Sequence, residues 1–217
     1  MNALVTGFEP FGGDRVNPAL DALGRLPPRL GALGIATRML PAVFGEALDT
    51  LEVAIRETNP DIVLCVGLAG GRAALSLERV AINIDDARIP DNKGRQPIDL
   101  PVVAGGPPAY FTTLPIKAAA AALREAGLPA IVSNSAGTFV CNHVFYGLLH
   151  LAATRWPGLR GGFLHVPYLP SQAARQDGAP SMALDDIVRG IEIVLTVAAA
   201  RRDDIAAPKE AHWGTIS

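Results

Sequence analysis

Apolar and polar positions follow two patterns along the chain: short continuous apolar runs, and longer stretches with apolar residues three and four apart. The first pattern is typical of strands and the second of helices, especially where Gly, Pro, Asn or Asp separates them. We predict strands at Ala3–Thr6, Ile35–Leu40, Asp61–Val66, Ser76–Ile84, Ala130–Ser133 and Gly162–Val166. We predict helices from Asn17 to about Leu26 and at Gly45–Thr58, Thr112–Ala126, Cys141–Trp156 and Met182–Arg202.

Strands and helices alternate over almost the whole sequence, which indicates an α/β fold. We predict one domain with a twisted, mostly parallel sheet and helices on both faces. Asp85–Pro108 is rich in Pro, Gly and Asp, so we expect a long, ordered loop or hairpin there. We place the domain at residues 1–202 and a polar C-terminal tail at residues 203–217.

Composition narrows the class of protein. A chain of 217 residues with 49% apolar and 18% charged residues is long and apolar enough to bury a large core. Its net charge of −2 leaves no basic excess to neutralise phosphates, so we expect no nucleic-acid partner. The N-terminal segment has neither the basic residues nor the apolar run of a signal peptide. We expect a cytoplasmic enzyme without a membrane partner.

Motifs for common cofactors are absent. The sequence has no GxxxxGK followed by Ser or Thr, and no HExxH. GLAGGR follows a predicted strand, but its glycine spacing is not GxGxxG and another strand follows it, where a dinucleotide fold requires a helix. Two cysteines are too few for a thiolate metal site. We therefore expect neither a cofactor nor a metal.

The strongest local signal is a cysteine at the start of a predicted helix. Cys141 follows a strand and a glycine-containing turn in AIVSNSAGTFVCNHVFYGLLH. A helix N-terminus favours the thiolate form, and its free N–H groups can bind an oxyanion next to the sulfur. The alternative is a small buried hydrophobe, which is common for free cysteine and suits Cys65 in the middle of a strand. Position alone leaves both possibilities open for Cys141.

A cysteine nucleophile needs a histidine, and the chain offers four. His143 is two residues along the same helix and faces elsewhere, and His150 lies roughly 180° round the helix from Cys141. His212 is in the polar tail. His165 ends the strand in GGFLHVP, and functional groups of α/β sheets gather at the carboxyl ends of strands. We therefore expect His165 at the same rim as Cys141, although a lone histidine there can also be structural.

An acid completes the candidate set. In SLERVAINI, period-two alternation puts Glu78 on the same face as three apolar residues. A carboxylate there needs a partner, and a histidine that it orients as in a catalytic triad is one possibility. An ion pair with Arg72 or Arg88 is the alternative. Asp85 and Asp86 are further acids in the adjoining loop.

These residues stand in longer motifs that resemble the pyroglutamyl-peptidase I family (the pyrrolidone-carboxylate peptidases). The motifs span nearly the whole chain: TGFEPFGG, GLAGGR, LERVAINIDDARIPDN, QPIDLPVV, SAGTFVCNHVFYG and FLHVPYLP. The resemblance implies a Glu–Cys–His triad on Glu78, Cys141 and His165, the three residues already singled out. The residues after Arg202 match nothing in the family.

The resemblance also implies an activity. A member would be a cysteine peptidase, a hydrolase that removes an N-terminal pyroglutamyl residue from peptides through an acyl-enzyme, without a cofactor. Arg88 and the backbone N–H of Cys141 would stabilise the oxyanion, and relatives commonly form homotetramers. The family pattern assigns substrate binding to Phe8, Phe11, Ile89, Phe139 and Val140. Such apolar walls suit a flat, neutral lactam.

One departure and two alternatives accompany this interpretation. Leu68 stands where many relatives carry glutamine, and a side-chain contact at that position would be lost. A glutamine-amidotransferase-like amidase also uses Cys, His and Glu, but in a G-x-C-x-G elbow rather than F-V-C-N-H. A catalytically silent ligand-binding domain or a phosphorylase-like enzyme on a similar fold is the second alternative.

Overall fold

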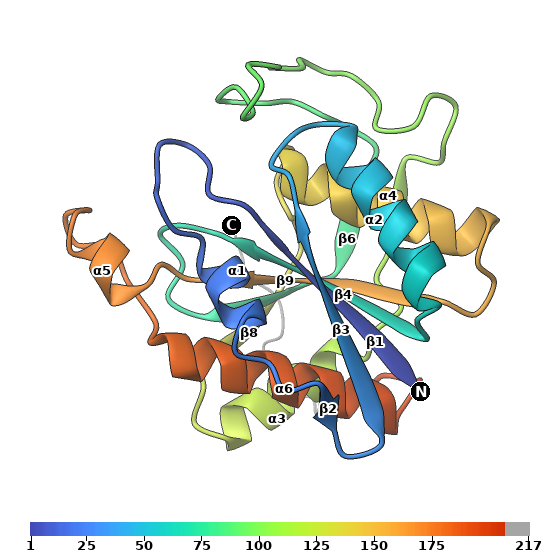
Figure 1. Ribbon diagram of the computed structural model, residues 1–217, viewed down its shortest axis with the longest axis vertical. Coiled ribbons are helices and arrows are strands. Elements are labelled where there is room, and N and C mark those ends of the chain that lie inside the picture. The colour runs from blue at the N-terminus through green and yellow to red at the C-terminus, as the bar shows by residue number, and fades with distance from the viewer. Residues whose placement is uncertain (207–217) are drawn as a thin grey trace.

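The computed structural model describes residues 1–206, which form a seven-stranded sheet between two layers of helices (Figure 1). The strand order is β2-β3-β1-β4-β9-β5-β8. The strands are β1 (Asn2–Phe8), β2 (Arg29–Leu30), β3 (Leu33–Leu40), β4 (Ile62–Leu68), β5 (Leu75–Glu78), β8 (Ala130–Ser133) and β9 (Arg160–Val166). The predicted α/β fold with a mostly parallel sheet is confirmed.

Strand direction changes between β9 and β5. Strands β3, β1, β4 and β9 are mutually parallel, whereas β5 pairs antiparallel with β9 and parallel with β8. The short strand β2 is antiparallel to β3. The part of the sheet that holds β5 and β8 therefore runs opposite to the rest, and this affects how the site is assembled.

Helices cover both faces of the sheet. They are α1 (Pro18–Leu23), α2 (Glu46–Thr58), α3 (Ile116–Glu125), α4 (Val140–Thr154), α5 (Pro170–Ala173) and α6 (Leu184–Ala200). Helices α1, α3 and α6 pack over one apolar cluster, and α2 and α4 over the other (Figure 1). Residues 140–149 of α4 are all buried, because this helix lies between the sheet and other elements. The predicted Asn-Pro start is confirmed, since the Asn17 side chain accepts from Ala19 N at 3.1 Å.

The predicted strand Ser76–Ile84 is wrong as a single element. It divides at Arg79 into β5 and β6 (Val80–Ile82), and β6 pairs antiparallel with β7 (Ala109–Phe111) in a separate two-stranded sheet. Arg79 N donates to Ser133 O at 2.8 Å in the main sheet, and Arg79 O accepts from Thr112 N at 2.9 Å beside the small one. β5 is buried throughout and β6 is partly buried, so the apolar pattern of the sequence does not mark the break between them.

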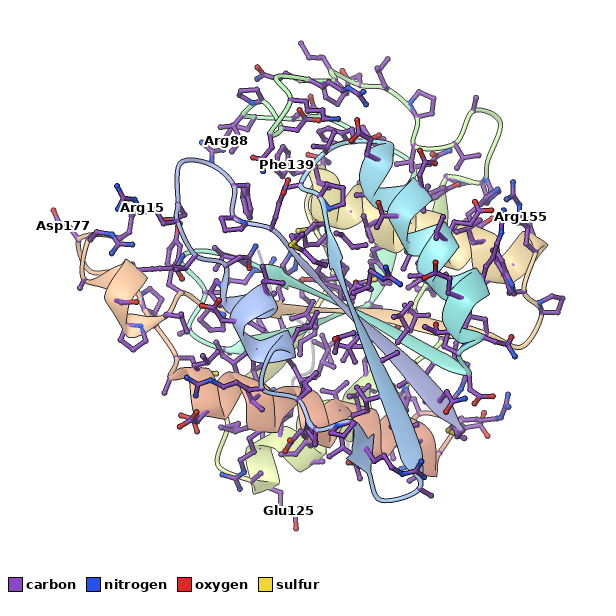
Figure 2. All side chains as sticks on the ribbon, in the orientation of Figure 1. Arg15, Arg88, Glu125, Phe139, Arg155 and Asp177 are labelled. Carbon is purple, nitrogen blue, oxygen red and sulfur yellow. The ribbon has the colours of Figure 1, made fainter. Side chains whose placement is uncertain are left out.

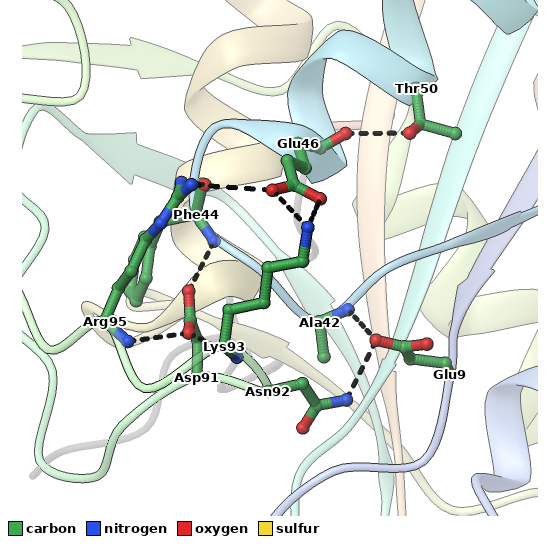
Figure 3. Close-up of polar contacts among 9 residues, drawn as sticks. All are labelled: Glu9, Ala42, Phe44, Glu46, Thr50, Asp91, Asn92, Lys93 and Arg95. Carbon is green, nitrogen blue, oxygen red and sulfur yellow. Dashed lines mark hydrogen bonds and ion pairs between the residues drawn. The ribbon is translucent and has the colours of Figure 1, made fainter.

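The Pro- and Gly-rich segment 85–108 is a long loop held by side chains, as predicted (Figure 3). Asp91 is buried and accepts through its two oxygens from Phe44 N at 3.0 Å and from Arg95 N at 2.9 Å. Arg95 Nη1 donates to Phe44 O at 2.7 Å, and Asn92 Nδ2 donates to Glu9 Oε1 at 2.8 Å. These bonds fix the loop to the segment before α2 and to the end of β1.

The C-terminal segment is described as far as residue 206. Asp204 accepts from Lys117 N and Ala118 N, both at 2.9 Å, and so satisfies the first turn of α3. The rest of the predicted tail, residues 207–217, lies outside the described residues. Within residues 1–206, no helix combines the length and the apolar character needed to cross a membrane.

Candidate active site

Three neighbouring strands bring the predicted site residues onto one face of the sheet. Gly67 on β4 is the register partner of His165 on β9, and Glu78 on β5 is the partner of Phe163 on β9. Paired residues project to the same face, and so do residues two apart on one strand. His165, Phe163 and Glu78 therefore share the face that α4 covers.

Glu78 contacts both a histidine and an arginine, which the sequence had offered as alternative partners. Its side chain is fully buried, and Oε1 lies 2.8 Å from His165 Nδ1 and 2.7 Å from Arg72 Nη1. Arg72 also donates to Ser135 O at 3.3 Å. A carboxylate oxygen can only accept, so the proton of the neutral imidazole lies on Nδ1. This leaves the Nε2 lone pair of His165 free to take a proton.

Cys141 is the second residue of α4 and reaches the same face by a different route from the one expected. We expected Cys141 and His165 to meet because their strands end at the same edge of the sheet, and this reason is wrong. β8 runs antiparallel to β9 and ends at Ser133, level with Glu78 and Phe163. Residues 134–139 carry the chain onward to the start of α4. Cys141 and His165 then line one cavity.

A missing side chain on β4 makes room for the sulfur. A Cβ on Gly67 would lie 2.9 Å from Phe163 Cζ and 3.0 Å from Cys141 Sγ, so either side chain would have to shift to make room for it. Glycine at this position therefore lets the thiol pack closely against β4, at the register partner of His165. Gly67 is the first residue of GLAGGR, directly after an apolar strand, and its role there was not predicted from the sequence.

The cavity at Cys141 has a volume of about 420 Å³ and mainly apolar walls. Its lining residues are Phe11, Leu68, Ala69, Arg72, Asp86, Arg88, Ile89, Ala136, Gly137, Thr138, Phe139, Cys141 and His165. Aromatic rings pack against one another at one wall: the centroids of Phe11 and Phe139 are 5.9 Å apart with the rings tilted, and Phe44 meets Phe139 edge-on at 5.4 Å. Figure 2 shows Phe139 and Arg88 on the same side of the molecule.

Two of the predicted pocket residues lie behind these walls. Phe8 is 2% exposed, with its ring 6.4 Å from that of Phe163, which in turn lies 4.7 Å from the ring of His165. Val140, the first residue of α4, is buried in the apolar core. The structure thus brings Phe11, Ile89, Phe139 and Arg88 to the cavity and leaves the other two in supporting positions.

The resting state of Cys141 differs from the expected thiolate. Burial raises the pKa of the Cys141 thiol to about 12, the negative charge of Glu78 and the neighbouring ionisable Cys65 add to the rise, and Arg72 opposes it. The low-dielectric surroundings outweigh the helix N-terminus. Burial likewise raises the pKa of Cys65 to about 12, as suits a strand cysteine inside the core. Both side chains are therefore neutral thiols at rest.

His143 and Asp85 are engaged with each other rather than with the cavity thiol. His143 Nδ1 lies 2.8 Å from Asp85 Oδ2, and its Nε2 accepts from Gly45 N at 3.1 Å. Both side chains are buried. This pair connects α4 to the start of the loop 85–108, and His150 is bonded to a tyrosine hydroxyl. His212 lies outside the described residues, and among residues 1–206 no cluster of three His, Cys, Asp or Glu is placed to hold a metal ion.

Comparisons with known proteins agree over almost the whole chain. The family described as Pyroglutamyl peptidase matches residues 1–201. A pyrrolidone-carboxylate peptidase of Erwinia tasmaniensis is 55% identical over 203 residues, which are 93% of this chain and 94% of the relative. One from Streptomyces coelicolor is 58% identical over 200 residues, 90% of this chain and 91% of the relative.

Solved structures give the same answer. The crystal structure of pyroglutamyl peptidase I from Bacillus amyloliquefaciens has a TM-score of 0.92 at 48% identity, covering 94% of this chain and 99% of the other. A variant of the pyrrolidone carboxyl peptidase of the hyperthermophile Pyrococcus furiosus has a TM-score of 0.90 at 45% identity, covering 92% and 99%. The chain belongs to the pyroglutamyl peptidase family.

Proposed function

We propose that this protein is a cysteine peptidase that removes N-terminal pyroglutamyl residues from peptides, with Cys141 as nucleophile, His165 as acid and base, and Glu78 as the group that orients His165. The observation that carries the proposal is the buried Glu78–His165 hydrogen bond of 2.8 Å, next to a thiol in an apolar cavity. Family membership supplies the reaction class.

The reaction begins from the neutral thiol. As Cys141 Sγ attacks the pyroglutamyl carbonyl carbon, its proton passes to His165 Nε2, and the imidazolium that forms is stabilised by Glu78 through Nδ1. A C–S bond forms and the carbonyl oxygen becomes an oxyanion. The raised pKa of Cys141 makes this proton transfer part of the attack rather than an earlier equilibrium.

Two hydrogen-bond donors stabilise the oxyanion, one at the start of α4 and one at the cavity wall. The first hydrogen bond of this helix runs from His143 N to Phe139 O at 3.1 Å, so the N–H of Cys141 comes before the helical ladder. That N–H and the exposed guanidinium of Arg88 at the cavity wall are the donors we assign to the oxyanion. When the tetrahedral intermediate collapses, the C–N bond breaks and His165 returns the proton to the leaving amine.

The second half of the reaction releases the acyl group. His165 takes a proton from water, the hydroxide attacks the thioester, and pyroglutamate leaves as Cys141 regains its hydrogen. The pyroglutamyl ring is flat and neutral, and Phe11, Phe139 and Ile89 offer it apolar walls. Leu68 adds an apolar contact where many relatives have an amide, so ring polar groups at that point must meet backbone atoms.

The remaining parts of the proposal rest on the family resemblance. They are a cytoplasmic homotetramer and a catalytic domain at residues 1–202. The resemblance also assigns substrate binding to Phe8 and Val140, and their burial behind the cavity supports an indirect role for them instead. A silent binding domain or an amidase is the competing interpretation, and substrate selectivity separates these from a peptidase.

The first test is selective hydrolysis. A pyroglutamyl chromogenic amide should be cleaved and the matching prolyl amide should not, because a charged ring amine is disfavoured between apolar walls. Cys141→Ser should lower kcat by at least about 10³-fold, since the hydroxyl is a far weaker nucleophile here. Cys65→Ser is the matched control and should keep turnover. Full activity of Cys141→Ser would remove the nucleophile assignment.

A second test addresses Glu78. Glu78→Gln keeps the size of the side chain but removes the charge that stabilises the imidazolium, so kcat should fall by about 10²- to 10⁴-fold. KM should change little, because Glu78 is fully buried and is not one of the cavity lining residues. Asp185→Asn on the exposed face of α6 is the matched neutralisation and should leave both constants unchanged. An unaltered kcat in Glu78→Gln would make the glutamate structural.

A third test uses the raised pKa of the free thiol. Iodoacetamide reacts with the thiolate, so modification of Cys141 in the free protein should become faster with each step in pH from 7 to about 10. Cys141 lines the cavity and Cys65 is fully buried, so Cys141 should react first in the folded protein. Peptide mass spectrometry distinguishes the two. A rate that is already constant above about pH 8 contradicts a pKa near 12.

A further inference from the structure

The catalytic cavity continues into a second hollow of about 490 Å³. The two share Phe11, Leu68, Arg88 and Ile89 as lining residues. A third hollow of about 460 Å³ shares Gly13 and Asp14 with the second and extends to α5. These second and third hollows are called the trough below. The trough joins the catalytic cavity at Phe11, Leu68, Arg88 and Ile89 and leads from there to the exposed residues beside α5.

The trough has a floor of exposed backbone and polar walls. Gly12 and Gly13 have φ values of 64° and 85°, and they present peptide groups without side chains above them. A Cβ on Gly70 would lie 2.2 Å from Tyr168 Oη, so glycine at this position lets the tyrosine lie across the wall. Gln176 lines the same stretch. Accessible peptide groups and amide or hydroxyl donors are what an extended peptide needs for its own backbone hydrogen bonds.

Positive charge dominates the walls. Arg88, Arg15 and Arg175 line the trough, and Asp14 is the one acid among its lining residues. The carboxylate of Asp14 is already engaged, since Oδ2 accepts from Gln172 Nε2 at 3.1 Å and Oδ1 lies 3.9 Å from Arg175 Nη2.

The positive charges of the three arginines, by contrast, are little compensated by nearby acids among the described residues. Arg15 and Arg88 are exposed, and within residues 1–206 neither has an ion-pair partner (Figure 2). Arg175 is 61% exposed and has only the long contact with Asp14. Asp177 lies further out beyond α5 and pairs with none of the three among the described residues (Figure 2).

The chemistry of the substrate determines what must lie in the trough. A pyroglutamyl residue is the first residue of its peptide, so everything beyond the scissile bond belongs to the leaving product. In the proposed complex the ring lies between Phe11 and Phe139 with its carbonyl at Cys141. The trough adjoins this ring site and is the space we assign to the rest of the peptide.

We propose that the trough binds the leaving part of the peptide and favours acidic side chains at the second and third residues after pyroglutamate, through Arg15 and Arg175. This inference rests on the proposed function and adds a preference among its substrates. Exposed charge pairs are weak and are screened by salt, so the preference should be a factor of about three to ten in kcat/KM at low salt.

The test uses three peptides that differ only at two positions: pyroglutamyl-Ala-Glu-Glu-Ala amide, its neutral Gln-Gln isostere, and its Lys-Lys counterpart of opposite charge. The terminal amide removes the C-terminal carboxylate, so only the side chains differ in charge. The parent should prefer Glu-Glu over Gln-Gln, and Gln-Gln over Lys-Lys, and the differences should shrink at high salt.

The decisive variant is the double substitution Arg15→Gln with Arg175→Gln. Each rate is divided by the same variant's rate on the chromogenic amide, which has no peptide tail. The Glu-Glu to Lys-Lys ratio should fall to below about half the parent value. Arg56→Gln with Arg155→Gln removes the same net charge from arginines that both pair with Glu52, and it should keep the parent ratio.

Two results overturn the inference: equal kcat/KM for the three peptides in the parent, or an acidic preference that persists in the double variant. Binding of the same peptides to Cys141→Ala separates this inference from the proposed function. If the parent cleaves no pyroglutamyl amide, the proposed function fails. Tighter binding of Glu-Glu than of Lys-Lys to Cys141→Ala would then still support the acidic preference, and equal binding would overturn it.

Discussion

The site depends on one buried carboxylate that is held from two sides. Glu78 is fully buried, and a lone carboxylate in that position would be very costly. Arg72 Nη1 lies 2.7 Å from Glu78 Oε1 and compensates the negative charge. The same oxygen lies 2.8 Å from His165 Nδ1 and fixes the orientation of the imidazole. Because the proton stays on Nδ1, Nε2 is ready to accept one. The fold meets this constraint by placing β5 next to β9 in reversed direction.

The other half of the site is built by helix packing. Helix α4 covers the face of the sheet that holds Glu78 and His165. Because Gly67 has no side chain, the sulfur of Cys141 packs closely against β4 at the register partner of His165. Burial of this sulfur makes it a neutral thiol at rest. In the mechanism that we propose, histidine and glutamate are therefore needed for the attack itself, since the thiolate is not available in advance. The same burial provides apolar surroundings of the kind that suit a neutral lactam ring.

The cavity walls are held by a loop that has little regular structure. Asp91 and Arg95 bind both backbone groups of Phe44, whose ring supports Phe139 at the cavity wall (Figure 3). The buried His143–Asp85 pair fixes the start of the same loop to α4. A segment with many Pro and Gly residues thus becomes a fixed wall through polar side chains, together with one antiparallel bridge between Asp85 and Leu100.

Much of this could be predicted from the sequence, and the failures have a common cause. Local patterns predicted the longer helices and strands but not the short elements β2, β7 and α5, and the chemistry of Glu78, Cys141 and His165 drew attention to those residues. Local patterns carry no strand direction, so the reversal of β5 and β8 and the division at Arg79 were missed. Gly67 was missed because its role depends on a sulfur that lies 74 positions away in the sequence. The raised pKa of Cys141 depends on tertiary burial, which outweighs the local helix end.

The most direct measurement is to look for the acyl group on Cys141. The protein is mixed with an excess of a pyroglutamyl thioester or ester, quenched in acid within the first turnovers, digested and examined by mass spectrometry. Our account predicts that the peptide holding Cys141 gains the mass of one pyroglutamyl group, that the Cys65 peptide does not, and that the gain disappears as turnover finishes. Turnover of the same substrate with no acyl group on Cys141, or with the acyl group on another residue, would contradict it.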